Sequence, residues 1–132
     1  MLSLLRRSDP EGPLAAWMLA VPEADLHLSA ITVGEIERGI GNAEGRDPGF
    51  ARHLAAWLSA LLTTFEDRVL PFGPAEARAW GRLSARLGNA TPDLMIAATA
   101  STHGLTVVTR NIRHFAPTGV PTLDPLAAEN GF

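Results

Sequence analysis

The residues best suited to chemistry in this sequence are two carboxylates, Glu35 and Asp93, each expected in the first turn of a predicted helix. Both are expected at the carboxyl ends of parallel strands, the edge where open α/β sheets bind their ligands. Clustered carboxylates repel each other, so one becomes neutral unless a cation lies between them. Mg²⁺ accepts one or two carboxylates together with water and substrate phosphates, and it activates water for displacement at phosphorus. The pair therefore indicates a divalent-metal site.

The alternative hypothesis is that these carboxylates have a purely structural role. An acid in the first turn of a helix is stabilised by the helix dipole alone, by about 0.3–1 kcal/mol. Taken singly, Glu35, Glu76 and Asp93 are each better explained in this way. Glu76 follows a predicted strand and is also expected at the carboxyl edge, but its surroundings, PAEARAWGR, indicate a structural role only.

The segment around Asp93 predicts a helix and a strand that lie antiparallel. Thr91-Pro92-Asp93 is typical of a helix start, and Gly104 is typical of a helix end. The helix would span about 18 Å at 1.5 Å per residue. The strand 105–110 would span about 20 Å. Because these lengths match, Asp93 should lie beside Asn111 at the end of that strand.

The other elements alternate between strand and helix, which predicts a central parallel sheet flanked by helices. We expect strands at 26–31 and 68–72, helices at 32–40, 50–65 and 74–88, a loop at 41–49 and an edge strand within 119–126. Ser29 and Thr32 lie near Glu35 and are candidates for orienting ligands, but for Thr32 a role as the helix N-cap is favoured. The first residues, LSLLRR, begin as though within an element.

Composition sets the class of protein. The chain has 132 residues, 46% of them hydrophobic, which predicts one globular domain over 1–132. It has no cysteine, so a disulfide framework and a thiol nucleophile are excluded. We expect a cytoplasmic protein without a membrane segment, because no signal peptide and no sufficiently long apolar run is visible. The net charge of −3 gives no general attraction to nucleic acid.

Three stretches carry a family resemblance: LSAITVGEIERGI, PDLMIAATASTHGLTVVTRNIRHF and TGVPTLDP. Together they closely resemble PIN-domain ribonucleases of the VapC/FitB toxin group, and the similarity covers nearly the whole chain. The resemblance implies a PIN-like fold and an endoribonuclease dependent on Mg²⁺ or Mn²⁺, the toxin of a type II toxin–antitoxin pair. It also implies a cognate VapB-type antitoxin, a homodimer, and contact with operator DNA only through the antitoxin.

The same resemblance assigns individual residues. Glu35 and Asp93 fall on the family's conserved acids, which hold the metal, and Asn111 falls on a third, weaker catalytic position. His114 stands where relatives often carry aspartate, and a neutral imidazole there can still contact metal or phosphate. Apart from the resemblance, Thr109 at the end of its strand is a candidate for hydrogen bonding to a metal-bound water, although a threonine in a strand needs no such role. Arg110 and Arg113 flank Asn111 and are candidates for holding RNA phosphates, with solvated arginines as the alternative.

The beginning of the chain departs from the family. Relatives open with a strand ending in Leu-Asp-Thr-Asn-Val-Leu-Ser, whose aspartate is a principal metal ligand, and here Met1 stands at the valine. We expect a valine codon read as an initiator, with Leu-Asp-Thr-Asn encoded in frame upstream; a stop codon there would refute this. As written, the N-terminal strand should be missing, its neighbours unpaired, and affinity for Mg²⁺ reduced. The alternative function is therefore a catalytically impaired PIN-like module that only binds its antitoxin. A DNA-binding regulator is disfavoured, because no basic recognition helix is visible.

Two further patterns concern surfaces. Arg78, Arg82 and Arg86 form one stripe along a predicted helix, for which a solvated or partner-facing role is favoured over RNA contact. The apolar stripe from Phe50 to Phe65 is explained mainly by packing in the core of this protein. The alternative is that part of the stripe binds an antitoxin helix. His27 and His103 lie in apolar surroundings and are expected to be structural.

Overall fold

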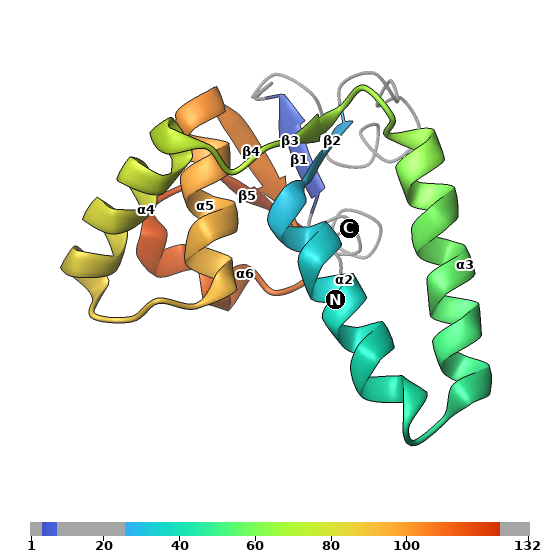
Figure 1. Cartoon of the computed structure of the whole chain (residues 1–132). Helices are drawn as coiled ribbons and strands as arrows, with labels where there is room; N and C mark the ends of the chain where they lie inside the picture. The colour runs from blue at the N-terminus through green and yellow to red at the C-terminus, as the bar shows by residue number, and fades with distance from the viewer. Residues whose placement is uncertain (1–3, 8–25, 125–132) are drawn as a thin grey trace, which may run out of the picture.

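The computed structural model describes residues 4–7 and 26–124 and contains one five-stranded sheet (Figure 1). The strands are β1 (Leu4–Arg7), β2 (Leu26–Ser29), β3 (Val69–Leu70), β4 (Leu105–Val108) and β5 (Thr122–Leu123). Their order across the sheet is β3-β2-β1-β4-β5. β2 pairs parallel with β3, and β4 pairs parallel with β5. β1 lies between these pairs and runs antiparallel to both neighbours. Four strands therefore point the same way, which confirms the predicted α/β fold class.

The centre of the sheet differs from the sequence-based expectation. A parallel first strand is not present in the described residues, but the expectation that its neighbours would be left unpaired is wrong. β1 fills the position in the opposite direction, with Leu4 opposite both Leu28 and Val108. Leu5 is fully buried, so this pairing satisfies backbone groups of β2 and β4 and also fills the core. Met1–Ser3, on which the prediction about the start depends, lie outside the described residues.

The described helices pack beside the sheet and against one another. They are α2 (Ala30–Glu44), α3 (Pro48–Thr64), α4 (Pro74–Leu87), α5 (Pro92–His103) and α6 (Ile112–Phe115), followed by the 3-10 turn η2 (Ala116–Thr118). In Figure 1, α4 and α5 lie side by side on the left, and α2 and α3 form a long hairpin that extends away on the right. The helices predicted from Pro74 and from Pro92 are confirmed.

Two apolar clusters hold these layers together. The first joins α5 to β1 and β4 and includes Leu5, Ile96, Ala100, Val107 and Phe115, all nearly inaccessible to solvent. The second lies inside the α2–α3 hairpin and consists of Ile40, Ala43, Ala51 and Leu58. The hairpin cluster explains why the predicted loop 41–49 is mostly helical: packing of Ala43 against α3 outweighs the low helix propensity of its glycine and asparagine neighbours. Among the helices of the described segments, none is long and apolar enough to cross a membrane.

Candidate active site at the carboxyl edge of the sheet

Asp93 is positioned by the α5–β4 hairpin. Pro92 begins α5, Asp93 lies in its first turn, and Gly104 ends it in the left-handed conformation with φ of 66°. The buried face of α5 packs against β4, which fixes the helix antiparallel to the strand. Asp93 therefore lies at the carboxyl edge of β4, as the matched lengths predicted, and its side chain is 31% exposed.

Glu35 is positioned by α2, but one turn later than expected. The strand β2 ends at Ser29, whose hydroxyl oxygen accepts a hydrogen bond from the Ile31 N–H at 3.1 Å and caps the helix. The prediction that Thr32 is the N-cap is therefore wrong; Thr32 is buried within the first turn. Glu35 consequently lies in the second turn of α2, exposed to solvent.

The structure brings these two carboxylates together. Partial burial raises the pKa of the Glu35 carboxyl, and the negative charge of Asp93 raises it further, whereas Arg38 lowers it. The two helices that carry these carboxylates, α2 and α5, also contact each other. Arg38 was not singled out from the sequence, although its i+3 spacing from Glu35 is the usual signal for such a pair.

His114 contacts the same carboxylate. Its Nδ1 atom lies 3.2 Å from Oδ2 of Asp93, and its side chain is 60% exposed. When Nδ1 carries a proton, it donates a hydrogen bond to Asp93, and in the doubly protonated ring this contact is also an ion pair. His114 therefore lies next to one of the two predicted metal-binding carboxylates, and its own predicted contact with metal or phosphate stays a prediction.

The turn after β4 positions the remaining predicted residues. The Asn111 N–H donates to the hydroxyl oxygen of Thr109 at 3.0 Å, a local bond that bends the chain from β4 into α6. Asn111 occupies the N-cap position of α6, but its side chain does not cap the helix. Arg110 and Arg113 are both exposed. Thr109 is buried, so its described contact is structural, and the roles predicted for these four residues stay predictions.

Glu76 does not join this group, and the expectation that it lies at the same edge is wrong. Its Oε2 atom is 2.7 Å from Nε2 of His103, and its Oε1 atom accepts from the Gly73 N–H at 2.9 Å. His103 ends α5, ten residues or about 15 Å along the helix from Asp93. α4 begins beside the far end of α5, because the two helices are antiparallel (Figure 1). The structural roles predicted for Glu76 and His103 fit these contacts.

The site suits a cation that keeps much of its water. Within residues 4–7 and 26–124, no group of three or more His, Cys, Asp or Glu side chains is arranged to hold a metal ion. Mg²⁺ requires fewer protein ligands, since one or two carboxylates with waters and substrate phosphates suffice. The repulsion that raises the Glu35 pKa is also the repulsion that a bound cation would relieve. Glu35 and Asp93 therefore fit a hard divalent ion bound in this manner.

Comparison with known proteins identifies the family. Residues 1–119 match the PIN domain. The VapC ribonuclease Y4jK of Sinorhizobium fredii is 33% identical over 134 residues, which cover 95% of this chain and 92% of that protein. The chain belongs to the PIN-domain family of VapC and FitB toxins. Toxin FitB of Neisseria gonorrhoeae is 31% identical to this PIN-domain protein over 124 residues, covering 90% of this chain and 88% of the toxin.

Solved structures agree with this PIN-domain assignment. The crystal structure of FitAcB from Neisseria gonorrhoeae superposes with a TM-score of 0.69 at 30% identity, covering 91% of this chain and 89% of the other. A structure of FitAB bound to an IR36 DNA fragment gives a TM-score of 0.68 at 29% identity, covering 90% and 86%. The resemblance seen in the three sequence stretches is thereby confirmed, and the chain is a member of a toxin–antitoxin ribonuclease family.

Proposed function

We propose that this protein is the toxin of a type II toxin–antitoxin pair and that it is a metal-dependent endoribonuclease. The observation that carries the proposal is the convergence of Glu35 and Asp93, from two distant parts of the chain, at the carboxyl edge of the sheet. Ligand sites of open α/β sheets lie at this edge. Relatives named as ribonucleases and toxins support RNA as the substrate.

Glu35 and Asp93 would hold Mg²⁺, or Mn²⁺ in its place. When bound, the ion supplies an activated water and neutralises charge that develops on the phosphorus oxygens. Asp93 is the better fixed of the two, because α5 is anchored by its buried face and His114 contacts its Oδ2 atom. That contact restrains the carboxylate in one orientation, which is the usual contribution of a residue behind a metal ligand.

Other residues of the same edge would hold the RNA. Arg110 and Arg113 are exposed on either side of Asn111, and guanidinium groups bind phosphate oxygens through paired charge-assisted hydrogen bonds. The Asn111 side chain is half-buried beside them and offers both a donor and an acceptor to substrate or water. Thr109 sets the turn that presents all three, whether or not it also binds a metal-bound water.

We also propose a cognate VapB-type antitoxin as the partner, with operator DNA bound only through it. Two solved relatives are complexes named FitAcB and FitAB, the latter on a DNA fragment. On this chain, α3 turns part of its apolar stripe outward: Phe50 is 52% exposed, and Trp57 and Leu62 are each 40% exposed. Such a face suits an amphipathic helix from a partner. A homodimer in the cytoplasm completes the proposal.

The nuclease proposal is tested by assaying cleavage of a mixed single-stranded RNA with Mg²⁺ and with EDTA. Asp93→Asn should lower the cleavage rate at least about a hundredfold, since one polar group acting on the transition state is commonly worth that much. The matched control is Asp67→Asn, the same chemical change at a side chain that is 86% exposed and outside the site. Equal activity in EDTA, or an Asp93→Asn chain as active as the control, would refute the proposal.

A catalytically impaired module that only binds its antitoxin is the alternative function. It is supported by a departure from the family pattern: His114 stands where relatives often carry aspartate, so one outer carboxylate is replaced by an imidazole. The same assay on a chain extended by Leu-Asp-Thr-Asn at its N-terminus separates the two functions. Cleavage only by the extended chain would mean that this sequence is impaired as written. Inactivity of both chains, with antitoxin binding intact, would favour the binding module.

A further inference from the structure

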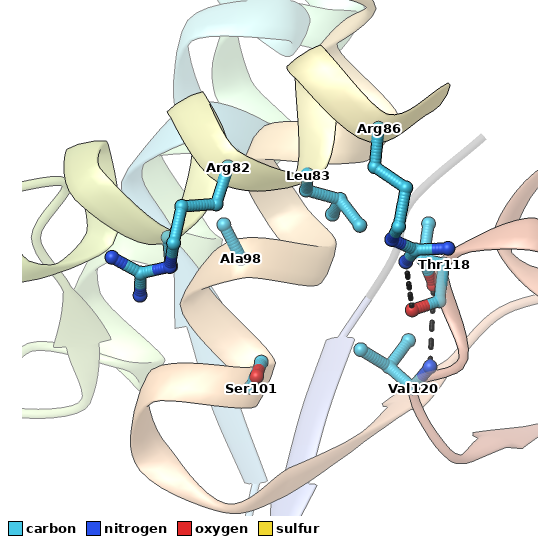
Figure 2. Close-up of a pocket in the computed structure, with 8 residues that line it drawn as sticks. Arg82, Leu83, Arg86, Ala98, Ser101, Thr118 and Val120 are labelled. Atoms are coloured by element: carbon cyan, nitrogen blue, oxygen red, sulfur yellow. Dashed lines mark hydrogen bonds between the residues drawn. The ribbon is translucent and has the colours of Figure 1, made fainter. Parts of the chain in front are cut away.

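A second site lies between α4, α5 and η2, where a pocket of about 330 Å³ opens on the surface (Figure 2). Its volume falls within the range of small-ligand sites. Two arginines of α4, Arg82 and Arg86, flank it, and Ser101 of α5 lies on its opposite side. None of these residues belongs to the carboxylate site.

The pocket is positively charged. Its lining contains both arginines and no acidic residue. Among the described residues, neither Arg82 nor Arg86 forms a salt bridge, and Arg82 has no hydrogen-bond partner. The two guanidinium groups point to opposite sides of the pocket (Figure 2), and each adds positive charge to its rim. The chain as a whole is acidic, so this local excess is a property of the pocket.

One of the two guanidinium groups is already held in place. Arg86 donates from Nη2 to the backbone oxygen of Thr118 at 3.4 Å, a bond drawn in Figure 2. A guanidinium carries five N–H donors, so most of those on Arg86 remain available to a ligand. Because the side chain is already restrained, binding costs less rotamer entropy than it would for a free arginine.

The floor of the pocket is apolar. Leu83 of α4 and Ala98 of α5 lie between the arginines and Ser101, and Val120 lies across from Ser101, below Thr118 (Figure 2). Ala98 is buried. A bare inorganic anion would gain nothing from these side chains. A ligand that joins a phosphate to a ribose and a base would use both parts, with its charge on the arginines and its ring against the floor.

We propose that this pocket binds a nucleotide unit through its phosphate group. The RNA substrate would supply this nucleotide, and in that respect the inference rests on the proposed function. Ala98 and Ser101 lie five and eight residues after Asp93, which is about 8 and 12 Å along α5. An RNA strand cut at the carboxylate edge would therefore reach the pocket within a few nucleotides. This pocket distinguishes Arg82 and Arg86 from Arg78, which belongs to the same stripe but does not line the cavity.

The test measures RNA binding without cleavage. A fluorescein-labelled ten-nucleotide RNA is titrated with the full chain carrying Asp93→Asn, in EDTA, and the fluorescence anisotropy is followed. Adding Arg82→Ala should weaken binding about tenfold, the usual loss when a hydrogen bond to a charged group is removed. The slope of the logarithm of the binding constant against the logarithm of the salt concentration should become less steep by about 0.7, the value for one phosphate contact on a single strand. Ser101→Glu, which places a negative charge in the pocket, should weaken binding similarly.

Arg78→Ala is the matched control, because it removes the same charge from the same helix face outside the pocket. It should change the affinity less than twofold. Equal losses in Arg78→Ala and Arg82→Ala would overturn the proposal, since the stripe would then act as a general positive surface. Unchanged binding in both pocket variants would also overturn it. Circular dichroism checks that each variant is folded.

Competition identifies the source of the phosphate. Displacement of the RNA by adenosine monophosphate, lost in Arg82→Ala, would support a site for free nucleotides as well as for RNA. Failure of the mononucleotide to compete would support a site for a phosphate within a chain. Inorganic phosphate competing as well as the mononucleotide would overturn the nucleotide assignment. A wild-type chain that never cleaves RNA, yet shows these losses, would reject the nuclease function while supporting the pocket.

Discussion

Replacing Glu35 by glutamine is expected to stabilise the metal-free protein at neutral pH. Burial and the Asp93 charge raise the pKa of folded Glu35 above its ordinary value of 4.5. Folded Glu35 therefore holds its proton more tightly than unfolded Glu35 does, and its contribution to stability is fully present below pH 4.5. That contribution is lost as the pH rises through the raised pKa. At pH 7 the ionised side chain opposes folding, whereas glutamine keeps the size without the charge.

The expected effect is small because α2 exposes Glu35 to solvent. Interactions between exposed charges are commonly worth about 0.2–1 kcal/mol after screening. For a chain of this length, that range corresponds to a rise in Tm of about 1–4 °C. The control is Glu37→Gln on the same helix. Its side chain is exposed, and Glu37 does not contribute to the pKa shift of Glu35.

Binding of a divalent ion should reverse the order of the Tm values, so that wild type melts above Glu35→Gln. A ligand that binds only the folded state stabilises it by about 2.7 kcal/mol at a hundred times its Kd. Wild-type protein should therefore gain about 10 °C in Tm when Mn²⁺ saturates the site. Glu35→Gln should gain less, because each tenfold loss of affinity removes about 1.4 kcal/mol of that stabilisation.

The assay is thermal unfolding followed by circular dichroism at pH 7, in EDTA and across a series of MnCl₂ concentrations. Isothermal titration with Mn²⁺ gives the affinities independently. The reasoning fails if Glu35→Gln melts below wild type in EDTA, since the repulsion would then be outweighed by a structural role. It also fails if Mn²⁺ raises the Tm of both proteins equally, because Glu35 would then not contribute to metal binding.

Three further predictions concern the framework and the proposed partner surface. Glu76→Gln should lower the unfolding free energy by about 1–2 kcal/mol and flatten the loss of stability in acid. The reason is that the backbone and His103 hydrogen bonds lower the pKa of Glu76, so its contribution exists above pH 4.5 and disappears as the pH falls. Urea unfolding between pH 3 and 7 tests this, and an unchanged pH profile would contradict it. Gly104→Ala should cost about 1 kcal/mol in urea unfolding because φ is 66°, whereas Gly41→Ala, which meets open space within α2, should stabilise by about 0.5–1 kcal/mol. Equal effects at the two glycines would reject the conformational explanation. Trp57→Ser should weaken antitoxin binding with little loss of stability, whereas Leu58→Ala should cost about 2–5 kcal/mol, because only Leu58 is buried. Unchanged antitoxin binding in Trp57→Ser, measured by titration calorimetry, would place the partner elsewhere.

The parts of the fold that the sequence predicts are those with local signals. Pro92 and Gly104 bound α5 through backbone requirements that do not depend on the rest of the chain, so the α5–β4 hairpin follows from the segment 92–108 alone. The direction of β1 has no such signal. Leu4 and Leu5 would satisfy a central strand equally well in either direction, because the hydrophobic effect and backbone pairing are indifferent to chain polarity.

The same difference between local signals and tertiary contacts explains which carboxylates could be assigned to the candidate site from the sequence. Glu35 and Asp93 converge because each is tied to the end of its own strand, and parallel strands share one carboxyl edge. Glu76 also follows a strand, but the three residues after β3 carry the chain across to the far end of α5. Its position is set by how α4 packs against α5, a tertiary contact that strand-end reasoning does not contain. A carboxylate can therefore be assigned to the carboxyl edge from sequence in two cases only. Either its helix follows a strand without an intervening loop, or its helix leads directly into a strand.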